Sequence, residues 1–255
     1  MDWDLLERAV DGGWIAGVVR AIKSGKEATV YLCRGTDTSA AELVAAKVYR
    51  EREQRSFRND AVYWEGAMRT YRRREKLAAT KKTTFGKGVR FGGWVSREWE
   101  TLRAAAAAGV SVPRPIERID GLILMDWVGD EDEAAPQLRH SGVRGAEAEA
   151  VFDQVLEQME LMLAANIVHA DLSEFNVLLT ALGRPVVIDF PQAVDPRFNR
   201  QARSLLERDL ANLARFFASR GAPRDVDAVT NTLWQCWLHS ELGAADDERS
   251  PGIDA

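Results

Sequence analysis

One short segment holds the residue types that phosphoryl transfer requires. Residues 169–176 have the sequence HADLSEFN, which sets Asp171 and Asn176 in an H-x-D-x-x-x-x-N spacing, and Asp189 follows a later apolar stretch. This chemistry needs a carboxylate near the acceptor hydroxyl and oxygen ligands that hold a metal ion across nucleotide phosphates. Taken singly, these residues are ordinary helix-cap, turn and strand-end residues. Their joint spacing predicts that Asp171 faces the acceptor and that Asn176 and Asp189 bind Mg²⁺ or Mn²⁺.

A hairpin is predicted to bring the two metal ligands together. Residues 177–179 and 186–188 are apolar and short, and a Gly-Arg-Pro turn separates them, which is typical of two strands joined by a turn. Asn176 precedes the first strand and Asp189 follows the second, so the hairpin sets them side by side. His169 is predicted to be a packed, hydrogen-bonded scaffold residue rather than a catalyst.

Two upstream segments are candidates for contacts with phosphate. A turn between predicted strands could place backbone N–H groups over phosphates, although it has one glycine and could be an ordinary hairpin turn. Its candidate nucleotide-binding residues are Ser24, Gly25, Lys26, Glu27, Ala28 and Val30. Further on, Lys47 lies among small and apolar residues of a predicted strand, where an unpaired ammonium group would be costly to bury.

Lys47 therefore needs an anion nearby. Glu98, on a helix predicted over residues 94–108, is the preferred partner, and Glu100 is the competing carboxylate. The plainer alternative is a lysine that extends from an edge strand into solvent.

The order of elements predicts an α+β protein with two lobes. Strands are predicted around residues 23–33, 43–49 and 121–125, with the helix over 94–108 before the last of them. An acidic turn at 129–133 is predicted to connect the lobes, and apolar residues at helical spacing predict three helices beyond it. We predict an N-terminal lobe over 1–128 with a flexible basic insertion at about 51–92, a C-terminal lobe over 129–243, and a disordered tail over 244–255.

Composition narrows the class of protein. The formal net charge is −5, and Cys33 and Cys236 are the only cysteines, so neither a zinc site nor a disulfide framework is indicated and both are predicted to be buried thiols. The N-terminus has no signal-peptide pattern, and no apolar run approaches the ~18 residues of a membrane span. A cytoplasmic protein without a membrane partner is predicted.

Together these motifs resemble the RIO family of atypical serine/threonine protein kinases, in the branch without an N-terminal winged helix. The resemblance extends from about residue 24 to 217 and rests on GKEATVY at 25–31, AKVY at 46–49, Trp94 with Glu98, HADLSEFN at 169–176 and IDFPQ at 188–192. It implies a two-lobed protein-kinase-like fold that binds ATP. It also implies specific roles: Lys47 on the phosphates with Glu98 as its partner, Asp171 as catalytic base, Asn176 and Asp189 on the metal, and a hinge facing adenine that includes Met125, Trp127 and Val128.

The same resemblance shows two departures from conventional protein kinases. Ser173 stands where those enzymes usually carry a lysine near the transferred phosphate, so one cation is missing and slow transfer is expected. Residues between Asp189 and the next helix form only a short link, without an activation segment for docking peptides. Glu207, Arg208 and Asp209 are predicted to bond from below to residues 169–176, which the resemblance makes the catalytic loop.

A basic segment over residues 69–90 contains a single acidic side chain, Glu75. It is predicted to be a solvated loop, a site of autophosphorylation, or a surface that binds RNA phosphates. Because members of the family act in maturation of the small ribosomal subunit, ribosomal RNA or a pre-ribosomal particle is a candidate partner, beside a protein acceptor or the chain itself.

The predicted function is that of an ATP-dependent serine/threonine kinase that phosphorylates itself or another protein, or of an ATPase that works as a switch. Two alternatives remain at this point. One is a small-molecule kinase of the aminoglycoside-phosphotransferase type, which usually has a second histidine where Ser173 and Glu174 occur here. The other is a non-catalytic ribosome-assembly module.

Overall fold

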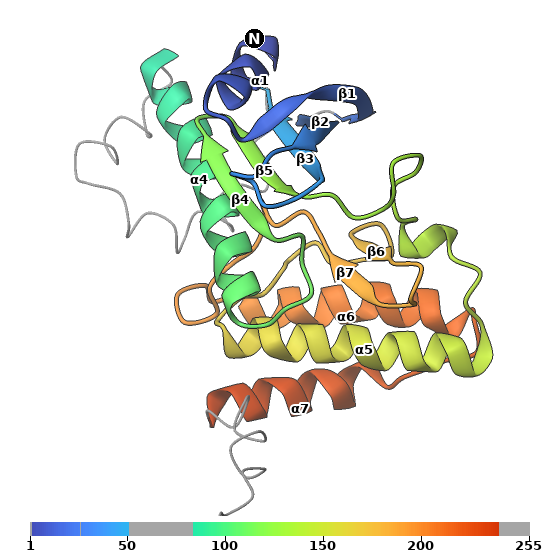
Figure 1. Cartoon of the computed structure of the whole chain (residues 1–255). Coiled ribbons are helices and arrows are strands. Elements are labelled where there is room, and N and C mark those ends of the chain that lie inside the picture. Colours follow the sequence, from blue (N-terminus) through green and yellow to red (C-terminus); the bar gives the residue numbers. More distant parts are fainter. Residues whose placement is uncertain (1, 26, 51–83, 240–255) are drawn as a thin grey trace, which may run out of the picture.

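The computed structural model describes residues 2–25, 27–50 and 84–239, and it joins an antiparallel sheet to a helical C-terminal part (Figure 1). The elements follow in the order α1 (Asp2–Asp11), β1 (Ile15–Ser24), β2 (Ala28–Gly35), β3 (Leu43–Tyr49), α4 (Thr84–Ala107), β4 (Pro115–Ile119), β5 (Leu122–Asp126), a 3-10 turn η1 (Leu138–His140), α5 (Gly145–Ala164), β6 (Val177–Leu179), β7 (Pro185–Val187), α6 (Ala202–Ala218) and α7 (Val226–Leu238).

The sheet has the strand order β1-β2-β3-β5-β4, and each neighbouring pair is antiparallel. Helix α1 packs on it through Leu6 and Ala9, whose side chains are buried with Val44 and Leu124 in one apolar cluster. Helix α4 contacts β4 and β5 and runs down one side of the sheet toward α5 in Figure 1. The sheet therefore has a core of its own, and α4 crosses it with one buried face.

The C-terminal part is built on α5, α6 and α7, which lie beneath the β6–β7 hairpin in Figure 1. Phe152 of α5 stacks on Phe217 of α6 with ring centroids 4.4 Å apart, and both side chains are fully buried. This larger apolar cluster also contains Leu172 of the catalytic loop and Val187 of the hairpin. The loop that carries the candidate site is thus anchored in a rigid helical base.

The α+β class is confirmed, whereas several element boundaries were predicted wrongly. The turn predicted at residues 24–25 does separate two strands, but the first of them already begins at Ile15 and follows helix α1, which burial of Leu6 and Ala9 and the acidic first turn favour. Strand β4 was not predicted. Helix α4 begins at Thr84 rather than at Trp94, so the last residues of the predicted insertion, 84–92, are helical. Glycines cost about 1 kcal/mol each in a helix, but extending a formed helix costs far less than nucleating one.

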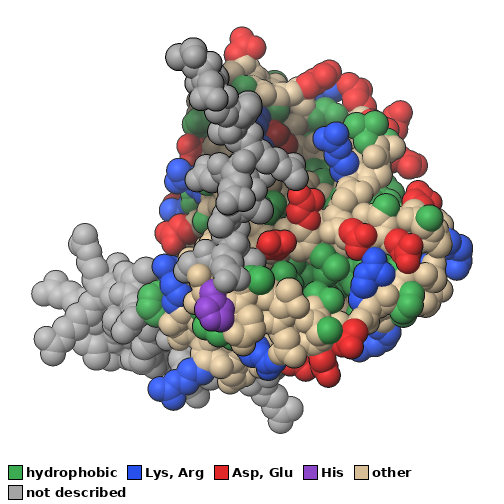
Figure 2. Space-filling view, turned by 90° about the horizontal axis from the view of Figure 1, so that it is seen from below, with side chains coloured by type: hydrophobic (Ala, Val, Ile, Leu, Met, Phe, Trp, Pro, Cys, Tyr) green, Lys and Arg blue, Asp and Glu red, His purple; other side chains and the backbone are tan. Residues whose placement is uncertain are grey.

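Other predictions are tested only in part. Most of the basic segment and the predicted tail lie outside the described residues. Cys33 is buried as predicted, but Cys236 is half-buried on α7. None of the helices that the structure describes has the length and apolar character of a membrane span. Acidic and basic side chains are interspersed on the face shown in Figure 2, without one extended patch of either sign among the residues drawn in colour.

Candidate active site

A cavity of about 310 Å³ lies between the sheet and the β6–β7 hairpin. It is lined by eleven of the residues predicted to form the site, namely Gly25, Glu27, Ala28, Val30, Lys47, Glu98, Met125, Trp127, Val128, Asn176 and Asp189. Ser24 does not line it, and its hydroxyl accepts a hydrogen bond from Arg50 at 2.7 Å. Lys26 lies outside the described residues.

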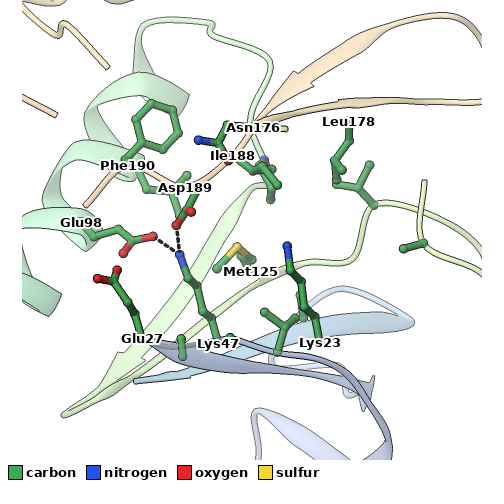
Figure 3. A pocket seen from close by; sticks show the side chains of 18 of the residues that line it. Lys23, Glu27, Lys47, Glu98, Met125, Asn176, Leu178, Ile188, Asp189 and Phe190 are labelled. Carbon is green, nitrogen blue, oxygen red and sulfur yellow. Dashed lines mark hydrogen bonds and ion pairs between the residues drawn. The ribbon is translucent and has the colours of Figure 1, made fainter. Parts of the chain in front are cut away.

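Lys47 joins the two sides of this cavity (Figure 3). Its ammonium group lies 2.6 Å from Oε1 of Glu98 and 2.6 Å from Oδ1 of Asp189. Glu98 is buried on α4, whereas Glu100, the competing carboxylate, is exposed. The position of Lys47 in β3 thus allows one cation to bind a carboxylate from α4 and another from the end of the hairpin.

The electrostatics of this cluster follow from burial and proximity. Burial alone would lower the pKa of Lys47, but the charges of Asp189 and Glu98 outweigh it and hold that pKa well above its ordinary value. Lys47 in turn lowers the pKa of Asp189. Burial raises the pKa of Glu98, and the Lys47 ammonium opposes that shift. Lys47 is therefore a permanent cation at the wall of the cavity.

Tyr49 is a member of this cluster that the sequence analysis did not assign. Its hydroxyl donates a hydrogen bond to Oε2 of Glu98, so Lys47 and Tyr49 each occupy one oxygen of that carboxylate. The Tyr49 ring is fully buried and meets Trp94 edge to face, with centroids 5.0 Å apart. Because strand residues two apart point to the same face, the spacing of Lys47 and Tyr49 could have indicated this role.

Replacing Tyr49 with Phe is expected to lower the free energy of unfolding by about 1–2 kcal/mol, because a buried carboxylate oxygen loses its donor. Tyr31→Phe is the matched control, since the Tyr31 hydroxyl bonds to Asp2 at 3.1 Å in a less buried setting. Urea denaturation of the two variants makes the comparison. Equal effects of the two substitutions would mean that the bond to Glu98 has no special weight.

The catalytic loop orients Asp171 through its neighbours. Nδ2 of Asn176 donates to the backbone oxygen of Asp171 at 2.8 Å, and Nε2 of Gln192 lies 3.3 Å from the Asp171 carboxylate. Burial and the charge of Asp189 raise the pKa of Asp171. A carboxylate with a raised pKa is a better proton acceptor, which suits a general base.

The backbone of this loop is strained at Ala170 and is held from below by α6. Ala170 has φ +63°, a left-handed conformation that is costly for a residue with a side chain. Asp209 of α6 accepts hydrogen bonds from the amides of Ala170 (2.7 Å) and Leu172 (3.0 Å), and Arg208 donates to the Ala170 oxygen. The predicted contact from Asp209 and Arg208 is confirmed. Glu207 was assigned wrongly, since it lies 4.0 Å from Arg203 on its own helix.

Asp209 also predicts a pH effect on stability. Burial raises its pKa to about 7, against about 4 in an unfolded chain, so between these values the folded protein holds a proton that the unfolded chain releases. The stability from this group is complete below pH ~4 and is lost as the pH rises through ~7. In chemical denaturation, the advantage of wild type over Asp209→Asn is expected to be larger at pH 5 than at pH 8. A difference that stays constant with pH would contradict this assignment.

His169 is the scaffold residue that the sequence predicted. It is 2% exposed, its Nε2 lies 3.1 Å from the Ile188 oxygen, and its ring packs against Phe190 at a centroid distance of 4.9 Å. Burial lowers its pKa to about 4, so the imidazole is neutral at neutral pH. It thereby ties the catalytic loop to the strand that leads to Asp189.

The site also suits a magnesium ion. Asn176 donates through Nδ2 to Asp171, which leaves its amide oxygen for another partner, and the backbone oxygen of Asn176 bonds to Ile188 N at 3.0 Å. Asp189 has φ +74° and uses only Oδ1 for Lys47. Amide and carboxylate oxygens are the ligands that Mg²⁺ prefers, with substrate phosphates completing its shell. No cluster of three His, Cys, Asp or Glu suited to a metal occurs in the described part of the chain, so a protein-only metal cage is not indicated there.

An antiparallel sheet above a helical base, with Lys47, Glu98 and Asp189 between them, is consistent with a protein-kinase-like phosphotransferase, and comparison with known proteins identifies the family. Residues 29–229 match the RIO domain family. The RIO-type serine/threonine-protein kinase Rio1 of Haloferax volcanii is 36% identical over 222 residues, which cover 87% of this chain and 70% of that protein. Rio1 of Thermoplasma acidophilum is 37% identical over 136 residues, 53% of this chain and 69% of that protein.

A human relative, the serine/threonine-protein kinase RIO1, is 29% identical over 214 residues, which cover 84% of this chain but 35% of the human protein. This chain belongs to the RIO family. The resemblance inferred from the motifs is confirmed, and the alternative of an aminoglycoside-phosphotransferase relative is not supported.

Proposed function

We propose that this protein is an ATP-dependent serine/threonine kinase of the RIO type that uses Mg²⁺ or Mn²⁺. The observation that carries the proposal is the contact of Lys47 with both Glu98 and Asp189 at the wall of one cavity. Such a cation can bind nucleotide phosphates while Asn176 and Asp189 hold the metal, and the bound metal would supply charge neutralisation of the phosphates. The division into lobes at 128/129, with adenine against Met125, Trp127 and Val128, is part of the same proposal.

In this proposal, Asp171 accepts the proton of the attacking hydroxyl. Its carboxylate lies 3.4 Å from Nδ2 of Asn176, beside the metal ligands, and it is oriented from two sides by Asn176 and Gln192. The reaction this supports is transfer of the γ-phosphoryl group of ATP to a Ser or Thr hydroxyl, with ADP as the leaving group and the hydroxyl proton passing to Asp171.

An ATPase activity at the same residues is the second candidate. Residues 190–201 alone connect Asp189 to α6, and they contain turns and one isolated bridge rather than an extended platform for a peptide. This favours the chain itself, a closely docked partner or water as acceptor. A role on pre-ribosomal particles through residues 69–90 remains a proposal that rests on the family alone.

The fate of the γ-phosphate distinguishes these activities. Single-turnover reactions with labelled ATP and Mg²⁺ are expected to give protein-bound phospho-Ser or phospho-Thr. Label released as free phosphate, or trapped in a hydroxylamine-labile adduct at Asp189, would establish the ATPase instead. Full complementation of a gene deletion by Asp171→Ala would favour a non-catalytic role.

A further inference from the structure

The cavity holds a second cation, Lys23, to which neither the sequence motifs nor the comparisons assign a role. Lys23 and Lys47 are the two cationic side chains among the described residues that line the cavity. Figure 3 shows both ammonium groups directed from the sheet into the cavity. They differ in their partners: Lys47 binds two carboxylates, whereas the Lys23 ammonium forms no ion pair or hydrogen bond with any described residue.

The register of the sheet explains why Lys23 faces the cavity. Lys23 pairs with Val30 on β2, and Val30 pairs with Lys47 on β3, so these three residues form one row across the sheet. Residues directly opposite each other in antiparallel strands project from the same face, and two strand spacings separate the ends of the row by about 10 Å. Both lysines therefore rise from one face, on either side of Val30.

A bulge in β1 places Lys23 in this row. Ala21 pairs with Tyr31 and Lys23 pairs with Val30, so two steps along β1 match a single step along β2. In a regular ladder Ile22 would be opposite Val30, and the cavity would have an apolar residue there. Bulges near functional sites commonly redirect a side chain in this way.

The charges around the cavity indicate a role for the Lys23 ammonium. The catalytic loop, residues 169–176, contains no Lys or Arg. Lys47 is already neutralised by Glu98 and Asp189, and Glu27 adds a further carboxylate to the cavity wall. A nucleoside triphosphate brings several negative charges into the cavity. Lys47 alone, already paired with two carboxylates, does not balance them.

We infer that Lys23 is a nucleotide-binding residue whose ammonium group contacts the phosphate chain of ATP. It supplies at the β1 side of the cavity the cation that the catalytic loop lacks. This inference rests on the proposed function, since it assumes that the cavity binds ATP. The inference depends on the strand register of this chain. It predicts that the cavity prefers phosphorylated adenosine over adenosine itself.

The test is equilibrium binding of adenosine, AMP, ADP and ATP to wild type and to Lys23→Met, which keeps an unbranched apolar stem. ATP affinity is expected to fall about tenfold, as for loss of one charge-assisted contact, while adenosine affinity changes less than twofold. Lys23→Arg is expected to retain most of the ATP affinity. In the order AMP, ADP, ATP, the shortest nucleotide whose affinity falls in Lys23→Met identifies the phosphate that Lys23 contacts.

Arg184→Met is the control for net charge, because Arg184 is an exposed cation in the β6–β7 turn that does not line the cavity. Its ATP affinity should match that of wild type. Equal losses of adenosine and ATP affinity in Lys23→Met would overturn the inference. It would also be overturned if Lys23→Met lost no ATP affinity, or if Arg184→Met lost as much ATP affinity as Lys23→Met. If wild type itself binds no ATP, the proposed function fails, which is a distinct outcome.

Discussion

Asp171→Asn is expected to lower the single-turnover rate of phosphoryl transfer by about 10²–10⁴, the usual contribution of a positioned general base. The amide is isosteric and can still meet Asn176 and Gln192, but it cannot accept the hydroxyl proton. ATP affinity should stay within about twofold of wild type, because Asp171 does not line the nucleotide cavity. Rapid-quench measurements with labelled ATP give the rate, and nucleotide titration gives the affinity.

Glu174→Gln provides the matched control for that substitution. Glu174 is a carboxylate of the same loop that does not line the cavity, and its backbone oxygen accepts a bond from Arg139 at 3.0 Å. Its transfer rate is expected to remain within about threefold of wild type, since no reacting group contacts it. A rate in Asp171→Asn within tenfold of wild type would remove Asp171 from the role of base.

Lys47→Met is expected to reduce both stability and nucleotide binding. Lys47 and Glu98 are 14% and 4% exposed, and removing one partner of a buried pair leaves an uncompensated charge at a cost of about 3 kcal/mol. Without Lys47, the pKa of Glu98 should rise further. Because a carboxyl group with a raised folded-state pKa gives stability that is lost as pH rises, the deficit should be smaller at pH 5 than at pH 8.

Denaturation of Lys47→Met, Lys23→Met and the double variant Lys47→Met/Glu98→Gln tests this pairing. Lys23→Met is the control, since it removes a lysine with no partner among the described residues, and it should cost less than about 0.5 kcal/mol. The double variant should recover part of the stability, because no buried charge is left unpaired. Equal stability of the two single lysine variants would show that the Lys47 pair is not a structural contact.

Local sequence patterns were sufficient to predict the loop and hairpin that position Asp171, Asn176 and Asp189. The spacing of Asp171, Asn176 and Asp189 requires only a loop and one short hairpin, and both are present where predicted. The pairing of Lys47 with Glu98 was also predicted, since a buried cation needs an anion. These features depend on contacts close in sequence or on a strong electrostatic requirement.

The features that were missed depend on tertiary contacts. The helical opening is stabilised by burial of Leu6 and Ala9 against strands far along the chain. The register that turns Lys23 inward depends on a bulge between paired strands, and a single sequence does not specify it. The bond from Tyr49 to Glu98 joins a strand to a helix whose relative position was unknown.

The most direct test of the central claim is equilibrium binding of ATP to wild type and to Asp189→Asn, with and without Mg²⁺. If the cavity is a kinase site with Asn176 and Asp189 as joint metal ligands, Mg²⁺ should tighten ATP binding at least tenfold in wild type and less than threefold in the variant. Failure of wild type to bind ATP, or equal tightening by Mg²⁺ in both proteins, would contradict the claim.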